Sequence, residues 1–250
     1  MINIGLKPEY IATVGGVGIT NTFVTSLLVS LLLIVFSLIF ALKGGKGKNI
    51  IIKSISVLLF EFLNLTDSVT GDRKLSKKIL PLIATFFIFI VTANLLALIP
   101  GFLGSFYIKT SAGQIPLLRS PNSDLTTTVA LAIFSVIAIQ FFSLQSLGLK
   151  NYIGRFLNFT NPIKFILGFF EMLSEGVKIL SFSFRLFGNI FAGEVLLLVI
   201  AFLVPYIIPL PFMILEVFVG VIQAFIFAIL TLTFIRTSTI QNLESEKTNK

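Results

Sequence analysis

The feature that most limits the fold is a run of 25 consecutive residues, 125–149, without Asp, Glu, Lys or Arg. About 20 apolar residues are enough to cross the hydrocarbon core of a bilayer. Further apolar runs follow one another along the chain, and hydrophobic residues make up 56% of the sequence against 12% for charged residues. A soluble core does not need such runs. The sequence therefore predicts an all-α, polytopic membrane protein.

The sequence contains neither cysteine nor histidine. Disulfide scaffolds, thiol catalysis and the common zinc sites are therefore excluded, and we expect no cofactor and no metal site. The net charge is +8, but the basic residues are not gathered on a polar domain that could present a phosphate-binding face. We expect the chain to contact a lipid bilayer and no nucleic acid.

Hydropathy predicts five membrane-embedded helices, at about residues 20–42, 79–98, 125–147, 163–204 and 212–235. Residues 50–65 are apolar but are interrupted by Lys53, Glu61 and Asn64, a pattern typical of an interfacial amphipathic helix. A marginal span is the alternative for this segment. Turn-forming residues separate the segments, at 44–47, 100–101, 120–123, 161–162 and 205–211.

These segments predict a single membrane domain over residues 1–250. Its parts are an N-terminal span with the amphipathic segment (1–78), a helical hairpin (79–162), a pair of long helices (163–236) and a tail (237–250).

The distribution of basic residues predicts the orientation, because cytoplasmic loops carry excess Lys and Arg. Fourteen of the nineteen basic residues fall in the first loop, the third loop and the tail. The N-terminus and the alternate loops hold only Lys7, Lys109 and Arg119. We therefore expect the N-terminus outside and the C-terminus in the cytoplasm.

Six ionisable residues interrupt the last two predicted spans: Glu171, Glu175, Lys178, Arg185, Glu194 and Glu216. Each ionised group near the bilayer centre costs about 2.5 to 3.5 kcal/mol on insertion scales, so function is the default explanation. For the first three, pairing along the helix and snorkelling to the interface is an alternative. For the last three, the alternative is a buried structural ion pair.

Helix geometry divides these residues between two faces. At about 100° per residue, Arg185 and Asn189 share a stripe of roughly 80° with Glu171, Glu175 and Lys178. Glu194 points about 180° away from Arg185 and lies on the order of 13.5 Å along the axis, too far for a direct ion pair.

On the last span, Glu216, Gly220 and Gln223 share one face, which makes Glu216 a plausible polar neighbour of Glu194. Two facing carboxylates in apolar surroundings would suit the uptake and release of protons. For Gln223, an interhelical hydrogen bond is an equally good explanation.

Residues 163–204 form a stretch that would be roughly 63 Å long as a helix, about twice the hydrocarbon thickness. Either this helix is steeply tilted, or it breaks near Gly188 or Gly193 into a hairpin. A hairpin would reverse the side of the tail and spoil the charge asymmetry. We therefore favour a tilted helix.

Residues 181–194 have the sequence SFSFRLFGNIFAGE, which resembles subunit a of F-type ATP synthases, the stator channel subunit of the membrane part Fo. Three other segments are similar to family segments in the same order: TANLLALIPG (92–101), SDLTTT (123–128) and QAFIFAILT (223–231). The resemblance covers about residues 75 to 240, and the N-terminal third matches only in layout.

The resemblance implies a function in proton translocation. Arg185 matches the family's essential arginine, which faces a rotating ring of c subunits that each carry one buried carboxylate. A guanidinium keeps its proton at any working pH, whereas lysine can be neutralised by desolvation. Asn189 matches a polar position near that arginine. Glu194, Glu216 and Gln223 resemble the lining of the half-channel open to the outside.

The resemblance further implies a second, inward half-channel, peripheral stalk b subunits as partners, and ATP chemistry on other subunits, so that this chain is not itself an enzyme. The family-like residues at 188–194 suggest the bacterial plasma (inner) membrane.

The chain departs from the family pattern at two positions. Many bacterial members carry histidine where Glu216 stands, a change that keeps a titratable group. Some carry an acidic residue one turn after the position of Asn94, where this chain has Ala97, which leaves the lining of the inner half-channel open. Asp124 follows a family-like acidic position, but a helix N-cap ahead of Leu125 explains it equally well.

Two other classes of protein are alternatives to the interpretation as a proton-translocating subunit. A stand-alone secondary transporter would use buried Arg and Glu residues as substrate and proton sites, but transporters commonly show a repeated half. This chain has an odd number of predicted spans and no second copy of the arginine motif. A structural scaffold would leave the buried charges unexplained.

Overall fold

The computed structural model describes residues 10–14, 17–42, 50–98, 107–110, 113–116, 119–156, 162–204 and 207–248. The predicted turns at 44–47 and 100–101 lie outside these residues. The helices are α1 (Asn21–Leu42), α2 (Ile50–Thr70), α3 (Arg73–Leu98), α4 (Leu125–Leu147), α5 (Leu149–Phe156), α6 (Pro162–Leu203) and α7 (Pro209–Thr248). The strands are β1 (Tyr10–Val14), β2 (Val17–Thr20), β3 (Tyr107–Thr110) and β4 (Gly113–Pro116), and a single 3-10 turn, η1, covers Pro121–Ser123.

Five helices in the described part of the chain, α1, α3, α4, α6 and α7, are long and apolar enough to cross a membrane. This result confirms the predicted all-α polytopic fold. The strands pair only as two short antiparallel hairpins, β1 with β2 and β3 with β4, which the sequence analysis does not predict. They form connections and contribute no membrane-spanning segment.

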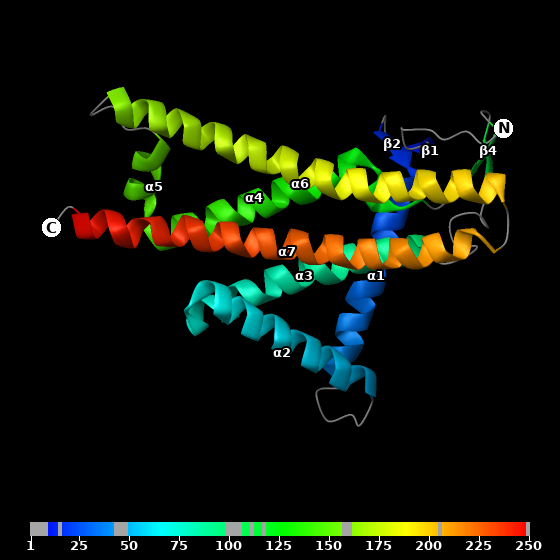
Figure 1. The fold of residues 1–250 in the computed structure, drawn as a ribbon, viewed down its shortest axis with the longest axis horizontal. Helices are drawn as coiled ribbons and strands as arrows, with labels where there is room; N and C mark the ends of the chain where they lie inside the picture. Colours follow the sequence, from blue (N-terminus) through cyan, green and yellow to red (C-terminus); the bar gives the residue numbers. More distant parts are fainter. Residues whose placement is uncertain are drawn as a thin grey trace.

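The long helix α6 is continuous from Pro162 to Leu203, so the alternative of a hairpin at Gly188 or Gly193 is wrong. Figure 1 shows α6 and α7 running side by side along the long axis of the molecule, whereas α1 runs steeply across it. These three helices cannot all stand perpendicular to one membrane. An upright α1 therefore requires a strong tilt of the long pair.

Two helix boundaries differ from the hydropathy estimate because hydropathy marks the apolar segment and not the helix. Helix α3 begins at Arg73, six residues before the predicted start, where the Asp72 side chain accepts a hydrogen bond from the Lys74 N–H at 2.8 Å. Helix α7 continues to Thr248, beyond the apolar segment, so residues 237–248 of the predicted tail are helical. The short helix α5 is also missing from the prediction.

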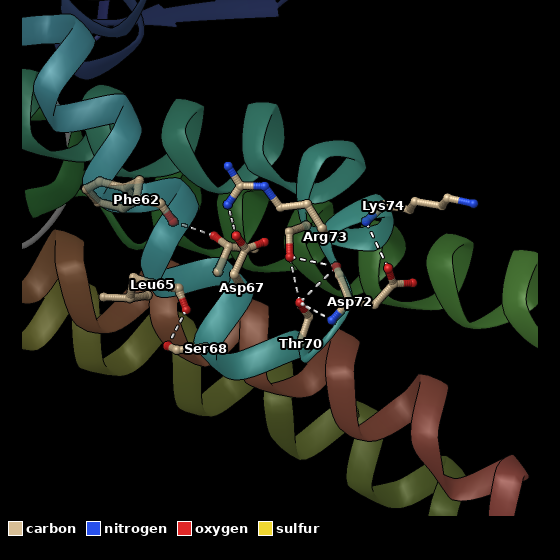
Figure 2. Close-up of polar contacts among 10 residues, drawn as sticks. Phe62, Leu65, Asp67, Ser68, Thr70, Asp72, Arg73 and Lys74 are labelled. Atoms are coloured by element: carbon tan, nitrogen blue, oxygen red, sulfur yellow. Dashed lines mark hydrogen bonds and ion pairs between the residues drawn. The ribbon is translucent and has the colours of Figure 1, made fainter.

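The turn between α2 and α3 is a compact polar structure (Figure 2). Gly71, with φ +68°, ends α2 and donates its N–H to the Asp67 carbonyl at 2.9 Å. The Asp67 carboxylate pairs with Arg73, and the Thr70 and Ser76 hydroxyls are hydrogen-bonded at 2.6 Å. The amphipathic segment therefore continues to Thr70, five residues beyond its predicted end, and packs against α3.

The core lies where α3, α4, α6 and α7 meet. One apolar cluster joins these four helices around the buried side chains of Phe86, Ile90, Leu186 and Phe227. A second cluster adds α2 through Phe62 to α3, α4 and α7. Helix α1 buries only a few positions near its start and leaves most of its apolar surface exposed, as expected for a lipid-facing helix.

Asp124 connects two helices at the start of α4. Its Oδ1 accepts a hydrogen bond from the Thr126 N–H at 2.9 Å, the N-cap interaction expected for this residue. Its Oδ2 accepts a hydrogen bond from the Thr22 hydroxyl of α1 at 2.7 Å.

We predict that Asp124→Ala lowers the free energy of unfolding by about 2 to 4 kcal/mol, because the cap is lost and the buried Thr22 hydroxyl loses its acceptor. Thermal denaturation of the purified chain in detergent measures this loss. Asp124→Asn is the matched control, because asparagine caps a helix as well as aspartate does. Equal damage from both substitutions would show that Asp124 is needed for its charge and not for its cap.

Candidate functional site

Arg185 lies on an exposed face of α6, within an apolar membrane segment. Its Nη2 donates to the Ser181 hydroxyl at 3.3 Å, a long hydrogen bond. Among the described residues, no carboxylate lies within ion-pair distance of its guanidinium. The alternative of a structural ion pair within this part of the chain is therefore wrong for Arg185. The helix presents a permanent positive charge on the outside of the bundle.

Asn189 lies one turn after Arg185 and connects α6 to α7. Its Nδ2 donates to Gln223 Oε1 at 2.7 Å. Gln223 is 2% exposed, whereas Asn189 is exposed. The interhelical hydrogen bond considered for Gln223 is therefore present, and Asn189 is its partner.

Glu216 of α7 packs against α6 next to Glu194, as the shared face of α7 predicts. The Glu216 carboxylate occupies the space where a β-carbon would stand on the buried residue Gly193. Glu194 is the next residue on α6, so the two carboxylates lie at the same level of the helix pair. Only glycine at position 193 leaves room for this carboxylate between the helices.

Arg119 lies beside the predicted site residue Glu194, a contact that the sequence pattern does not predict. It precedes η1, and its Nε lies 3.6 Å from Glu194 Oε1. The two side chains are 12% and 23% exposed. The distribution of basic residues assigns Arg119 to an outer loop, and no periodicity links it to Glu194, which lies 75 residues later in the sequence. One weak signal exists, because Arg119 is among the few basic residues of the predicted outer side.

A chain of buried amides joins the same turn to α3 and α7. Asn122 Nδ2 donates to Asn94 Oδ1 at 2.7 Å, and Asn94 Nδ2 donates to the Gly220 carbonyl at 3.0 Å. Both side chains are almost fully buried. A β-carbon at Gly220 would lie 3.1 Å from that of Asn94, so glycine permits the close approach. Asn94 thus belongs with the turn that also supplies Arg119.

Glu175 lies on the other side of Arg185 and pairs with Lys178 at 2.7 Å, so the pairing along the helix that was the alternative to function is present for these two residues. The Lys178 Nζ also lies 5.0 Å from the centroid of the Phe234 ring on α7. Both charged side chains are largely covered, at 13% and 15% exposed.

The arrangement has three levels along α6. The Glu175–Lys178 pair, Arg185 and Glu194 follow one another at intervals of about 10 to 15 Å along the helix axis, from a rise of about 1.5 Å per residue. Polar groups between the helices therefore approach Arg185 from both directions. No group of His, Cys, Asp or Glu residues in the described part of the chain could hold a metal ion.

Comparison with known proteins identifies the family. Residues 23–236 match the family described as "ATP synthase A chain". The subunit a of ATP synthase from Moorella thermoacetica is 33% identical over 236 residues, which cover 92% of this chain and 95% of that protein. The subunit a from Campylobacter jejuni (strain 81-176) is 35% identical over 181 residues, 71% of this chain and 72% of that protein. The subunit a from Nitrosospira multiformis is 30% identical over 235 residues, 92% of this chain and 84% of that protein.

These matches cover the helices that carry the site and confirm the resemblance found at residues 181–194. The chain belongs to the ATP synthase A chain family, the membrane-embedded a subunits in the Fo part of F-type ATP synthases.

Proposed function

We propose that this chain is the proton-translocating stator subunit of its ATP synthase. In this proposal, two offset half-channels end at Arg185, which faces the carboxylates of a rotating ring of c subunits. The chain performs no ATP chemistry itself, and b subunits of a peripheral stalk hold it against the ring. Family membership favours this function over that of a stand-alone secondary transporter.

The observation that carries the proposal is the exposed charge of Arg185. A charged side chain on the outside of a membrane helix is costly unless a partner compensates it. Among the described residues, the Arg185 guanidinium has no carboxylate in reach and only a long hydrogen bond to Ser181. A carboxylate on a neighbouring subunit would supply the missing partner. Because a guanidinium does not lose its proton, it would also stop protons from passing directly between the half-channels.

The surface beside Arg185 favours the close approach of another helix. Gly188 is exposed one turn away, and a β-carbon built there would meet no atom within 4 Å. Its small size is therefore not required by packing within the described chain. Small residues commonly mark the places where membrane helices approach one another closely.

The polar groups between the helices support two separate routes to Arg185. Glu194, Glu216 and Gln223 line the outer route, with Asn189 at its inner end and Asn94 beside it. The Glu175–Lys178 pair lies on the inner route. Because the routes meet Arg185 from opposite directions, a proton must travel on the ring to pass from one to the other. The membrane potential contributes about 2.3 kcal/mol per charge per 100 mV to this movement.

The proposed orientation has the N-terminus outside and the C-terminus in the cytoplasm of a bacterial cell, with the chain in the plasma (inner) membrane. Basic residues support this orientation, since the first turns of α3 carry Arg73, Lys74, Lys77 and Lys78. Figure 1 supports it as well, because the C-terminus and α5 lie at the end of the molecule opposite to the two hairpins.

We predict that Arg185→Gln and Arg185→Lys both lower proton-coupled ATP synthesis at least about 100-fold in the reconstituted complex, while the chain still inserts and assembles. Ser181→Ala is the control, because it removes the hydrogen-bond acceptor of Arg185 and keeps the charge. It should leave coupling close to that of the unmodified complex. Normal coupling with Arg185→Gln would refute the proposed function.

We predict that Glu194→Gln and Glu216→Gln each slow passive proton flux through Fo by about tenfold or more, because a titratable group leaves the outer route. The pH dependence of the flux should also change, because each substitution removes a carboxyl group that can exchange a proton on the outer route. Flux into vesicles from which the catalytic head has been removed measures both effects. Unchanged flux in both variants would remove these carboxylates from the pathway.

We predict that Gly193→Ala slows the same flux several-fold, because its methyl group displaces the Glu216 carboxylate. Overpacking of this kind costs about 1 to 3 kcal/mol. Gly176→Ala on the same helix is the control, since nothing lies within 4 Å of the β-carbon position there. Full flux in Gly193→Ala would show that the position of Glu216 between the helices is not needed.

A further inference from the structure

Arg119 brings a second permanent cation into the membrane domain. Its side chain is 12% exposed, and its Nε lies 3.6 Å from Glu194 Oε1. Glu216, the other carboxylate at this level, has no cation within ion-pair distance among the described residues. Arg185 lies on the opposite face of α6, on the order of 13.5 Å from Glu194 along the axis. Arg119 therefore supplies the positive charge next to Glu194.

The backbone that carries Arg119 is held by three other helices. The Arg119 N–H donates to the Thr25 hydroxyl of α1 at 3.2 Å. The following residues bind α3 through Asn122 and cap α4 through Asp124. The guanidinium therefore extends toward α6 from a well-anchored base.

The positive charge of Arg119 attracts the Glu194 carboxylate but leaves its Oε2 without a hydrogen bond from the described residues. The distance of 3.6 Å is an ionic contact but is beyond hydrogen-bond length. Glu194 Oε2 is buried and accepts no hydrogen bond from the described residues. This oxygen stays able to accept a proton, while the positive charge of Arg119 keeps the side chain turned toward the η1 turn.

We propose that Arg119 is a positioning residue of the proton route, which holds the Glu194 carboxylate toward the η1 turn at the entrance of the outer half-channel. This inference rests on the proposed function and adds to it. The two carboxylates then have different places in the route. Glu194 lies beside the η1 turn and has Arg119 as its counter-charge. Glu216 lies against Gly193 between α6 and α7 and has no counter-charge among the described residues.

The test is a double-mutant cycle in the complete ATP synthase complex, with Arg119→Gln, Glu194→Gln and the combination of both. Passive proton flux through Fo and the amount of c ring that co-purifies with the chain are measured for each variant. Arg119→Gln should lower flux about tenfold or more, because removal of one partner leaves a buried charge uncompensated. Arg119→Lys should restore most of the flux, since it restores the charge.

In the Glu194→Gln background, the additional Arg119→Gln substitution should change flux less than about twofold, because the charge that Arg119 serves is already absent. A full tenfold additional loss would overturn the inference. If Arg119→Gln alone prevents assembly, recovery of assembly in the double variant supports the inference. Failure of both to assemble contradicts it, because Arg119 would then act through other contacts.

Arg185→Gln, measured in parallel, separates this inference from the proposed function. Normal proton-coupled ATP synthesis in that variant would refute the proposed function. The interaction between Arg119 and Glu194 would still be measured, from the amount of c ring that co-purifies with the variants of the double-mutant cycle.

Discussion

The polar turn at residues 119–124 is the constraint on which the arrangement of the helices depends. Its residues from Ser120 to Asp124 are all buried, although most of them are polar. Inside a membrane domain, each unsatisfied polar group costs several kcal/mol, so such a turn is tolerated only where protein groups surround it. Here α1, α3, α4 and α6 supply those groups through the hydrogen bonds of Thr25, Asn94 and Asp124 and the ion pair of Arg119. If one of these helices shifted along its neighbours, polar groups of the turn would lose their partners. The turn thus sets the relative positions of the helices that carry the candidate site.

The polar residues of α6 and α7 fall into two groups. One group lies on the exposed surface of the helix bundle, and the other lies in the seam, the contact between the two helices. Arg185 and Asn189 reach the outside of the bundle, whereas Gln223 and Glu216 lie between the two helices. The apolar cluster around Leu186 and Phe227 lies beside this seam and holds the helices together. Because the packing is provided by the apolar cluster, the polar residues are free to serve a purpose other than stability. The hydrogen bond between Asn189 and Gln223 is the one described contact that joins the exposed face to the seam next to Arg185.

Sequence periodicity predicts those parts of this structure that depend on one helix at a time. The five spans follow from hydropathy, the division between Arg185 and Glu194 follows from 100° per residue, and the Asp124 cap follows from the residue before an apolar run. Contacts between distant residues are different. The pairing of Arg119 with Glu194 and of Asn122 with Asn94 depends on how a short turn docks against helices elsewhere in the chain. A basic residue in a loop has the same sequence pattern whether it faces water or a buried carboxylate. The family motif at residues 181–194 therefore points to Glu194 but not to its counter-charge.

Two glycines show how a polar route can exist inside a packed helix pair. Helices normally fill their contact surface with side chains, and a void between them forfeits packing energy. At Gly193 the missing side chain is replaced by the Glu216 carboxylate, and at Gly220 the close neighbour is the Asn94 side chain. The polar groups thus occupy volume that apolar side chains would otherwise take, so the interior stays filled while it becomes polar. This replacement links the proposed function to stability, because any larger residue at either glycine must displace a polar group of the proposed route or separate the helices. Gly193 and Gly220 have no reactive side chain, but they leave the space that the polar side chains occupy. The motif at residues 181–194 therefore supplies both this space, at Gly193, and a charged side chain, at Glu194.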